Sequence, residues 1–345
     1  MITAFLTYFY RTQRVTRAQQ FFKQGNELMQ ADRYEEAVEQ YRHALSISHT
    51  TEERLALGMA LVKAGHLEEA EIYLNQVLRQ NPNSGPANVG LGRILLQRGE
   101  IAEALKYYHR AIYGAWRDDP QANRLEARLE LINALGKAGA KQQAQAELLA
   151  LAADMPPQTA MRKRIGQLLL EYGLPRNSAG VFSEIAQKNR NDAEAQSGLG
   201  EAELASGDFS SAEKSFREAV RLDAANATYQ KRLQLVERVI ALDPAVPGLH
   251  ASDRFERGRK LLEAAVGAFD QCGAGWSEPV PEDFRGLADS ARKILLRHGR
   301  PRSYSDEADS DINLAERIWG ARIKLCGPAT PAEEPLSRVM ARLPK

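Results

Sequence analysis

Small residues recur along the first two thirds of the chain at an almost constant spacing, in stretches dominated by helix-forming residues. One series consists of Gly25, Gly58, Gly92, Gly166 and Gly200. A second series, with steps of 33, 34, 40, 34 and 34 residues, consists of Ala37, Ala70, Ala104, Ala144, Ser178 and Ala212. A fixed period of this length is typical of repeat architectures, so the pattern predicts stacked helical hairpins in place of a single globular core.

Proline and glycine mark the ends of the predicted helices. The single long step of 40 residues is absorbed between Tyr113 and Leu125, where Gly114 and Pro120 indicate a loop. The sequence therefore predicts a solenoid over residues 18–245, in six repeats and a polar capping helix. The repeats are expected near residues 18–50, 51–84, 85–118, 125–158, 159–192 and 193–226, and the capping helix over 227–242.

The period and the residues that carry it resemble the tetratricopeptide repeat family, whose unit is a helix–turn–helix of 34 residues. Matching positions are Phe21, Gly25, Leu28, Tyr34, Ala37, Tyr41 and Ala44 in the first repeat, and Leu91, Gly92, Leu95, Ala104, Tyr108 and Ala111 in the third. The fourth repeat departs from the pattern, with Ile132 where glycine is expected. The resemblance implies an all-α, right-handed α-solenoid whose first helices (A helices) line a concave groove for a partner protein or peptide.

Carried over position by position, the resemblance implies a set of groove residues. They are Asn26, Gln30, Met59, Lys63, Arg93, Gln97, Asn133, Lys137, Lys163, Gln167, Glu171 and Glu201. The amides can bond a partner backbone in either direction, and the cations in the middle of the groove favour an acidic segment. A clamp for a chaperone C-terminus is not expected, because Phe22 and Ala56 stand where that clamp needs lysine and asparagine.

The N-terminal segment, residues 1–17, is apolar and then basic. Ile2 to Tyr10 is less than half the length that spans a bilayer, and Arg11, Arg14 and Arg17 follow it. Two interpretations stay open: a first helical turn against the first repeat, or the end of a membrane anchor that begins outside this chain. Cytoplasmic and membrane-anchored locations both remain possible on this pattern.

Residues 246–345 lose the repeat and are predicted to form a small helical domain. Asp253 and Glu256 resemble a capping box at a helix start, and further helices are expected from Pro281, from Asp311 and over 335–343. A basic run, Arg292, Lys293, Arg297, His298, Arg300 and Arg302, precedes the acidic Asp306, Glu307, Asp309 and Asp311. The simpler interpretation is that the basic run and the acidic run form two faces that neutralise one another.

Cys272 and Cys326 each end a predicted helix and precede glycine. Two half-buried free thiols are favoured over a disulfide, which an oxidising compartment would permit. The two cysteines have no spacing typical of a zinc site, and we expect no metal or cofactor.

The composition and the motifs of the chain argue against nucleic-acid binding and against a dinucleotide-binding site. With 46 Lys+Arg against 45 Asp+Glu, the chain lacks the basic excess of a nucleic-acid binder. Gly90-Leu91-Gly92 and Gly198-Leu199-Gly200 lack the strand and the third glycine of a dinucleotide site. We therefore expect a non-catalytic, bacterial-type scaffold or adaptor. The alternatives are an assembly factor of a membrane or envelope complex, or an enzyme with its site in residues 246–345.

Overall fold

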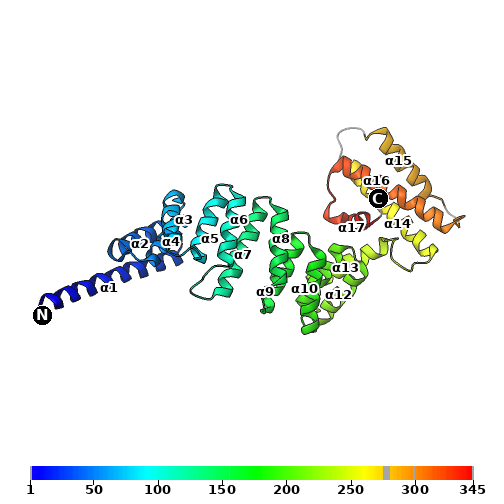
Figure 1. Cartoon of the computed structure of the whole chain (residues 1–345). Helices are drawn as coiled ribbons and strands as arrows, with labels where there is room; N and C mark the ends of the chain where they lie inside the picture. The colour runs from blue at the N-terminus through cyan, green and yellow to red at the C-terminus, as the bar shows by residue number, and fades with distance from the viewer. Residues whose placement is uncertain (1, 155, 275–279, 298–299, 344–345) are drawn as a thin grey trace. The chain divides into compact units, whose positions relative to one another are not determined.

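The computed structural model describes residues 2–154, 156–274, 280–297 and 300–343. Over these ranges the chain is all-α, with seventeen α-helices, one short 3₁₀ helix and no strand (Figure 1). The helices form two compact units, Met1–Asp154 and Met155–Lys345, called the N-terminal unit and the C-terminal unit below.

The N-terminal unit consists of four helical hairpins, each with an A helix followed by a B helix. They are α1 (Ile2–Gln30) with α2 (Tyr34–Ser48), α3 (Thr51–Ala64) with α4 (Leu67–Gln80), α5 (Gly85–Gln97) with α6 (Ile101–Ile112), and α7 (Pro120–Lys137) with α8 (Lys141–Ala153). Each A helix contacts its own B helix, and α3, α5 and α7 also contact one another in succession. This arrangement is the tetratricopeptide solenoid that the periodicity predicts.

Glycine allows the two helices of a hairpin to approach closely. A Cβ added at Gly25 would lie 2.6 Å from Cε1 of Tyr41, and one at Gly92 would lie 2.7 Å from the ring of Tyr108. Contacts this short are not tolerated, so the large side chain of helix B fills the space above a bare backbone on helix A.

The long step in the repeat corresponds to an ordered loop between α6 and α7. The Ala115 N–H donates to the Asn83 carbonyl at 2.6 Å, and the Gly85 N–H donates to the Ala115 carbonyl at 2.9 Å. The Trp116 indole covers Gly85 and donates to the Ala111 carbonyl at 2.8 Å. The extra residues thus fasten the end of the third hairpin to the start of its own A helix.

The C-terminal unit holds two more hairpins, a single A helix and the last four α-helices. They are α9 (Thr159–Glu171), α10 (Pro175–Lys188), α11 (Ala193–Ser206), α12 (Phe209–Leu222), α13 (Ala227–Leu242), α14 (Ala251–Gly273), α15 (Glu282–Leu295), α16 (Tyr304–Cys326), η1 (Pro331–Glu333) and α17 (Glu334–Arg342). One hydrophobic core runs from Leu204 and Phe216 of the last hairpin to Val339 and Leu343. The last repeat and the C-terminal helices therefore fold as one body.

Helix α17 returns to the end of the repeats and packs against α13. Arg342 forms an ion pair with Asp243, whose side chain is fully buried. The Arg342 guanidinium also lies 5.2 Å from the centre of the Phe209 ring. Helix α17 therefore covers a face of α13 that a further repeat helix would otherwise cover.

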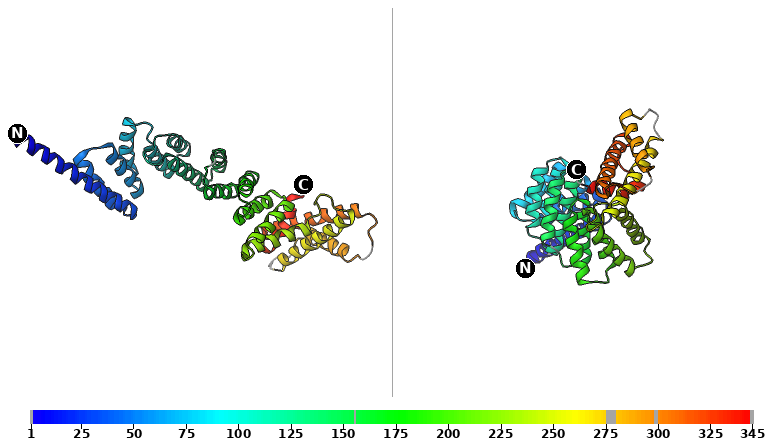
Figure 2. Two further views of the ribbon diagram at one scale, coloured as in Figure 1. Left: turned by 90° about the horizontal axis from the view of Figure 1, so that it is seen from below. Right: turned by 90° about the vertical axis from the view of Figure 1, so that its right-hand side faces the viewer.

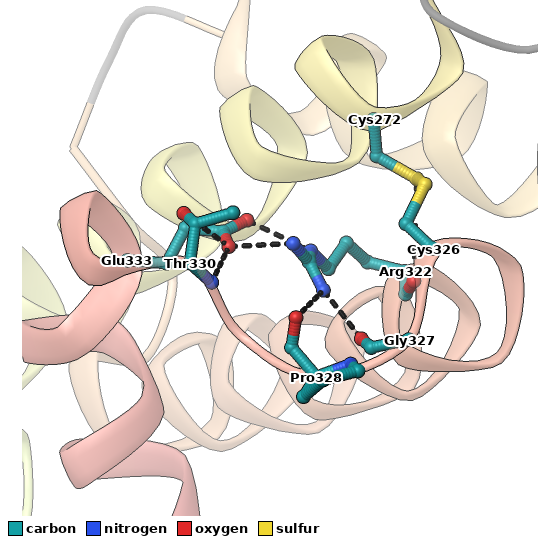
Figure 3. A network of polar contacts seen from close by, with 7 residues as sticks. All are labelled: Cys272, Arg322, Cys326, Gly327, Pro328, Thr330 and Glu333. Atoms are coloured by element: carbon teal, nitrogen blue, oxygen red, sulfur yellow. Dashed lines mark hydrogen bonds and ion pairs between the residues drawn. A yellow bond between two sulfur atoms is a disulfide. The ribbon is translucent and has the colours of Figure 1, made fainter.

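The ends of α14 and α16 are joined by a disulfide between Cys272 and Cys326 (Figure 3). This is the less favoured of the two alternatives that the sequence left open, and it became possible because the two helices lie side by side with these Cα atoms 6.1 Å apart. One turn before Cys326, Arg322 binds Glu333 through two contacts of 2.8 and 2.6 Å. Arg322 also donates to the carbonyls of Gly327 and Pro328, so it holds the connection between α16 and α17.

Two predicted helix starts in this region are wrong. Helix α16 begins at Tyr304, where the Ser303 side chain accepts from the Asp306 N–H, and not at Asp311. Asp311 lies inside the helix, buried, and accepts from Arg259 at 2.7 Å. Helix α14 begins at Ala251, two residues before the expected cap at Asp253.

The first A helix extends well beyond its partner helix. Helix α1 runs without interruption from Ile2 to Gln30, so the backbone of residues 2–17 continues into the first repeat. Within the described part of the chain, no helix combines the length and the apolar character needed to cross a bilayer.

Candidate functional site

The predicted groove residues lie on the A helices of both units. In the N-terminal unit they are Asn26 and Gln30 on α1, Met59 and Lys63 on α3, Arg93 and Gln97 on α5, and Asn133 and Lys137 on α7. The surface that these eight side chains form is called the A-helix face below. Lys163, Gln167, Glu171 and Glu201 lie on α9 and α11 of the C-terminal unit.

Besides Asn26, five side chains of the A-helix face are exposed: Gln30, Lys63, Gln97, Asn133 and Lys137. Within the described residues none of them has a hydrogen bond or an ion pair, and Lys63 has a single cation–π contact, 5.9 Å from the ring centre of Tyr34. Four successive A helices thus present amide or ammonium groups whose hydrogen-bonding capacity is free for a partner.

Arg93 is neutralised by a residue that the sequence analysis missed. Its guanidinium makes two contacts of 2.6 Å with the Glu130 carboxylate on α7, and the Tyr108 hydroxyl donates to the same carboxylate at 2.6 Å. Burial favours the protonated acid, but the bonds from Arg93 and Tyr108 outweigh it and hold the pKa of Glu130 below its ordinary value. Burial and the nearby carboxylate raise the pKa of Tyr108. This triad joins two A helices.

The lowered pKa of Glu130 predicts a pH dependence. A carboxyl group whose pKa is lower in the folded state stabilises the fold above its unfolded pKa of 4.5, and this contribution is lost as the pH falls through the folded value. The pair is about three-quarters buried (25% and 28% exposed side chains), so we expect Glu130→Gln to cost about 1 kcal/mol at pH 7. Urea unfolding at pH 7 and at about pH 3.5 measures this, and the cost is expected to shrink at the lower pH. A cost that is equal at both pH values would contradict the assignment.

Two further residues of the face serve the internal packing. Asn26 accepts a hydrogen bond of 2.6 Å from the Tyr41 hydroxyl, whose pKa burial raises to about 12. Met59 is half-buried, and its sulfur would lie 3.0 Å from a Cβ added at Gly90 on the next A helix. Both side chains therefore make contacts within the repeats themselves.

In the C-terminal unit two of the three predicted groove ions are paired as well. Lys163 donates to Asp192 and to Glu194 at 2.7 Å each. Glu201 forms a bidentate ion pair with Arg232 on α13. Gln167 and Glu171 are exposed.

The predicted basic middle of the groove is consequently weaker than the sequence suggested. Arg93 and Lys163 are compensated by carboxylates on the following A helix, and Lys63 and Lys137 keep exposed charges. The missed partners lie about one repeat further along the sequence, since Glu130 follows Arg93 by 37 positions and Arg232 follows Glu201 by 31.

The motifs that resemble catalytic or cofactor sites have packing roles. A Cβ added at Gly90 would lie 2.7 Å from Leu74, and one at Gly198 would lie 2.4 Å from the ring of Phe182. These glycines therefore accommodate neighbouring side chains. Across the residues that the structure describes, no group of three His, Cys, Asp or Glu side chains is arranged to hold a metal ion.

Comparison with known proteins identifies the repeats. Residues 55–123 and 163–227 match one family model described as tetratricopeptide repeat, and residues 16–49 match a second model with the same description. A protein of Escherichia coli O157:H7 named cellulose synthase operon protein C is 25% identical over 189 residues, which is 52% of this chain and 16% of that protein.

Solved structures of repeat proteins also resemble the chain. The C-terminal part of a TPR repeat-containing protein from Cytophaga hutchinsonii is 12% identical, with 91% of this chain and 99% of that one covered and a TM-score of 0.45. YrrB, described as a TPR protein with an unusual peptide-binding site, is 14% identical, with 56% and 97% covered and a TM-score of 0.38. The TPR2AB domain of yeast Sti1 in complex with pHSP90 is 17% identical, with 87% and 98% covered and a TM-score of 0.34.

Proposed function

We propose that this chain, which belongs to the tetratricopeptide repeat family, is a non-catalytic scaffold or adaptor that holds a partner protein on its A-helix face. The observation that carries the proposal is the row of exposed side chains on α1, α3, α5 and α7 that have no hydrogen bond or ion pair within the described residues. Side chains at such positions can bind a partner without breaking internal contacts of the repeats.

The exposed side chains of the A-helix face indicate which groups of a partner they can bind. The amides of Gln30, Gln97 and Asn133 can each donate to and accept from a peptide backbone. Lys63 and Lys137 add two exposed positive charges without an ion pair within the described residues, and these charges favour acidic side chains at the matching positions of the partner. The partner segment we propose is therefore an extended or helical stretch with acidic residues.

Substitutions on the A-helix face test this proposal. We expect the triple variant Lys63→Glu, Asn133→Ala, Lys137→Glu to recover at least about tenfold less of a specific partner than the wild type, because two attractive charges become repulsive. Affinity purification from the native lysate, with quantitative mass spectrometry, measures the loss. Arg93 is left intact, since changing it would leave Glu130 without its counter-ion.

A matched control separates the face from net charge. Arg79→Glu, Gln142→Ala, Lys141→Glu makes the same charge change and removes one amide at exposed positions on the B helices α4 and α8. This variant is expected to retain the partner. If both variants lose it equally, or neither does, the A-helix face is not the binding surface.

A second candidate function is that of an assembly factor of a membrane or envelope complex. In this candidate, residues 1–17 tether the chain to the membrane. The match to the cellulose synthase operon protein supports it, although only 16% of that protein is matched. The apolar residues at the start of α1 and the arginines that follow them in the sequence also favour it.

A further inference from the structure

The basic and acidic runs around residue 300 do not neutralise one another as the sequence suggested. Asp309 pairs with Arg254, and Asp311 pairs with Arg259, both on α14. Arg292 is bound by Asp270 and Asp289. The expected partners are thus engaged elsewhere, because helix packing brings α14 alongside α16.

Four cations of the basic run remain exposed. Lys293, Arg297, Arg300 and Arg302 have no ion pair within the described residues, and His298 lies outside those residues. The first acidic groups that follow the run along the chain are Asp306 and Glu307 in the first turn of α16, where Glu307 accepts from the Arg302 backbone N–H at 2.8 Å. Counted together with Arg292, the run has five positive charges against four negative ones (Asp270, Asp289, Asp306 and Glu307), which leaves an excess of one positive charge.

An apolar side chain stands among these cations. Leu296, at the C-terminal end of α15, is 72% exposed. Figures 1 and 2 show the C-terminal end of α15 and the start of α16 at the same end of the group of C-terminal helices. Lys293, Leu296, Arg297, Arg300 and Arg302 are called the basic tip below.

We propose that the basic tip docks on the surface of an anionic lipid bilayer. The arginines and the lysine would lie at the level of the lipid phosphates, and Leu296 would enter the boundary between headgroups and acyl chains. An aliphatic side chain exposed among cations fits this surface better than a nucleic acid, on which aromatic side chains stack. A purely polar acidic polymer would pair with the charges but would leave Leu296 in water. The proposal is independent of the A-helix face.

Co-sedimentation of the full chain with vesicles tests the basic tip. One set of vesicles is phosphatidylcholine alone, and the other contains about one third phosphatidylserine. We expect binding to the anionic vesicles only, weakened by added salt. Each cation near such a surface contributes roughly fivefold in affinity, so Arg297→Glu, Arg300→Glu, Arg302→Glu is expected to bind at least about 100-fold more weakly.

Two further variants make the outcome specific. Leu296→Ser is expected to weaken vesicle binding by about tenfold without changing the charge. Arg164→Glu, Arg176→Glu, Arg190→Glu alters three exposed arginines elsewhere in the same unit and is expected to bind within about threefold of the wild type. Circular dichroism confirms that each variant is folded.

Three results would overturn the proposal. Equal binding to neutral and anionic vesicles would remove the role of charge. Wild-type binding by the basic-tip arginine variant would assign lipid contact to another segment, such as residues 1–17. Loss of binding in the arginine variant with no effect of Leu296→Ser would show that Leu296 does not enter the bilayer, and the proposed docking through this side chain would be wrong.

Discussion

Replacing Phe182 by alanine is expected to lower the free energy of unfolding of the C-terminal unit by about 3–5 kcal/mol. Phe182 on α10 is almost completely buried, and its ring lies under two glycines of different A helices. A Cβ added at Gly166 on α9 would lie 2.7 Å from the ring, and one at Gly198 on α11 would lie 2.4 Å from it. The ring therefore fills the space that both helices leave open, and its loss creates a cavity between them.

Urea unfolding followed by circular dichroism measures this cost. Gly198→Ala is expected to cost about 1–3 kcal/mol through overpacking, and much less when Phe182→Leu is introduced with it, because the smaller side chain makes room for the methyl group. Leu296→Ala, at an exposed position of the same unit, is the control and is expected to change stability by less than about 0.5 kcal/mol. A cost below about 1 kcal/mol for Phe182→Ala would show that the ring is not the packing element.

The sequence predicts this packing because it is local and periodic. Gly25 lies against Tyr41, Gly92 against Tyr108, and Gly166 against Phe182. In each case the large side chain follows its glycine by the same number of residues, since both stand at fixed places in one hairpin. The fold of the repeats can therefore be predicted from the two series of small residues, because the contacts involved lie within one hairpin.

The sequence could not predict contacts that depend on how distant helices meet. The interpretation of Asp311 as a helix start was reasonable, because an acidic residue in the first turn is favourable, but Asp306 and Glu307 satisfy the same rule earlier. The Ser303 cap sets the helix start locally, and the place of Asp311 inside the helix is matched by Arg259, 52 residues away, which binds it. The pairing of Arg93 with Glu130 depends in the same way on how two A helices meet, because the two residues stand 37 positions apart.

The buried ion pair of Arg322 and Glu333 predicts the second large effect on stability. Their side chains are 4% and 10% exposed, and Arg322 also holds the carbonyls of Gly327 and Pro328 (Figure 3). Arg322→Met is expected to cost about 3–5 kcal/mol at pH 7, because it leaves the Glu333 carboxylate buried without a counter-ion. Arg317→Met, at an exposed position of the same helix, is the matched control and is expected to cost less than about 0.5 kcal/mol.

The pH dependence separates this charge effect from a loss of packing. Burial favours the protonated form of Glu333, but bonds from Thr330 and the charge of Arg322 hold its pKa below the ordinary value of 4.5. Stability from this group is therefore present above about pH 4.5 and is lost as the pH falls through the folded pKa, so the cost of Arg322→Met is expected to shrink in urea unfolding near pH 3.5. The double variant Arg322→Met, Glu333→Leu is expected to recover much of the stability at pH 7, since no charge remains buried. If the double variant is as unstable as the single one at both pH values, the carboxylate is not the cause, and the lost bonds to Gly327 and Pro328 account for the effect.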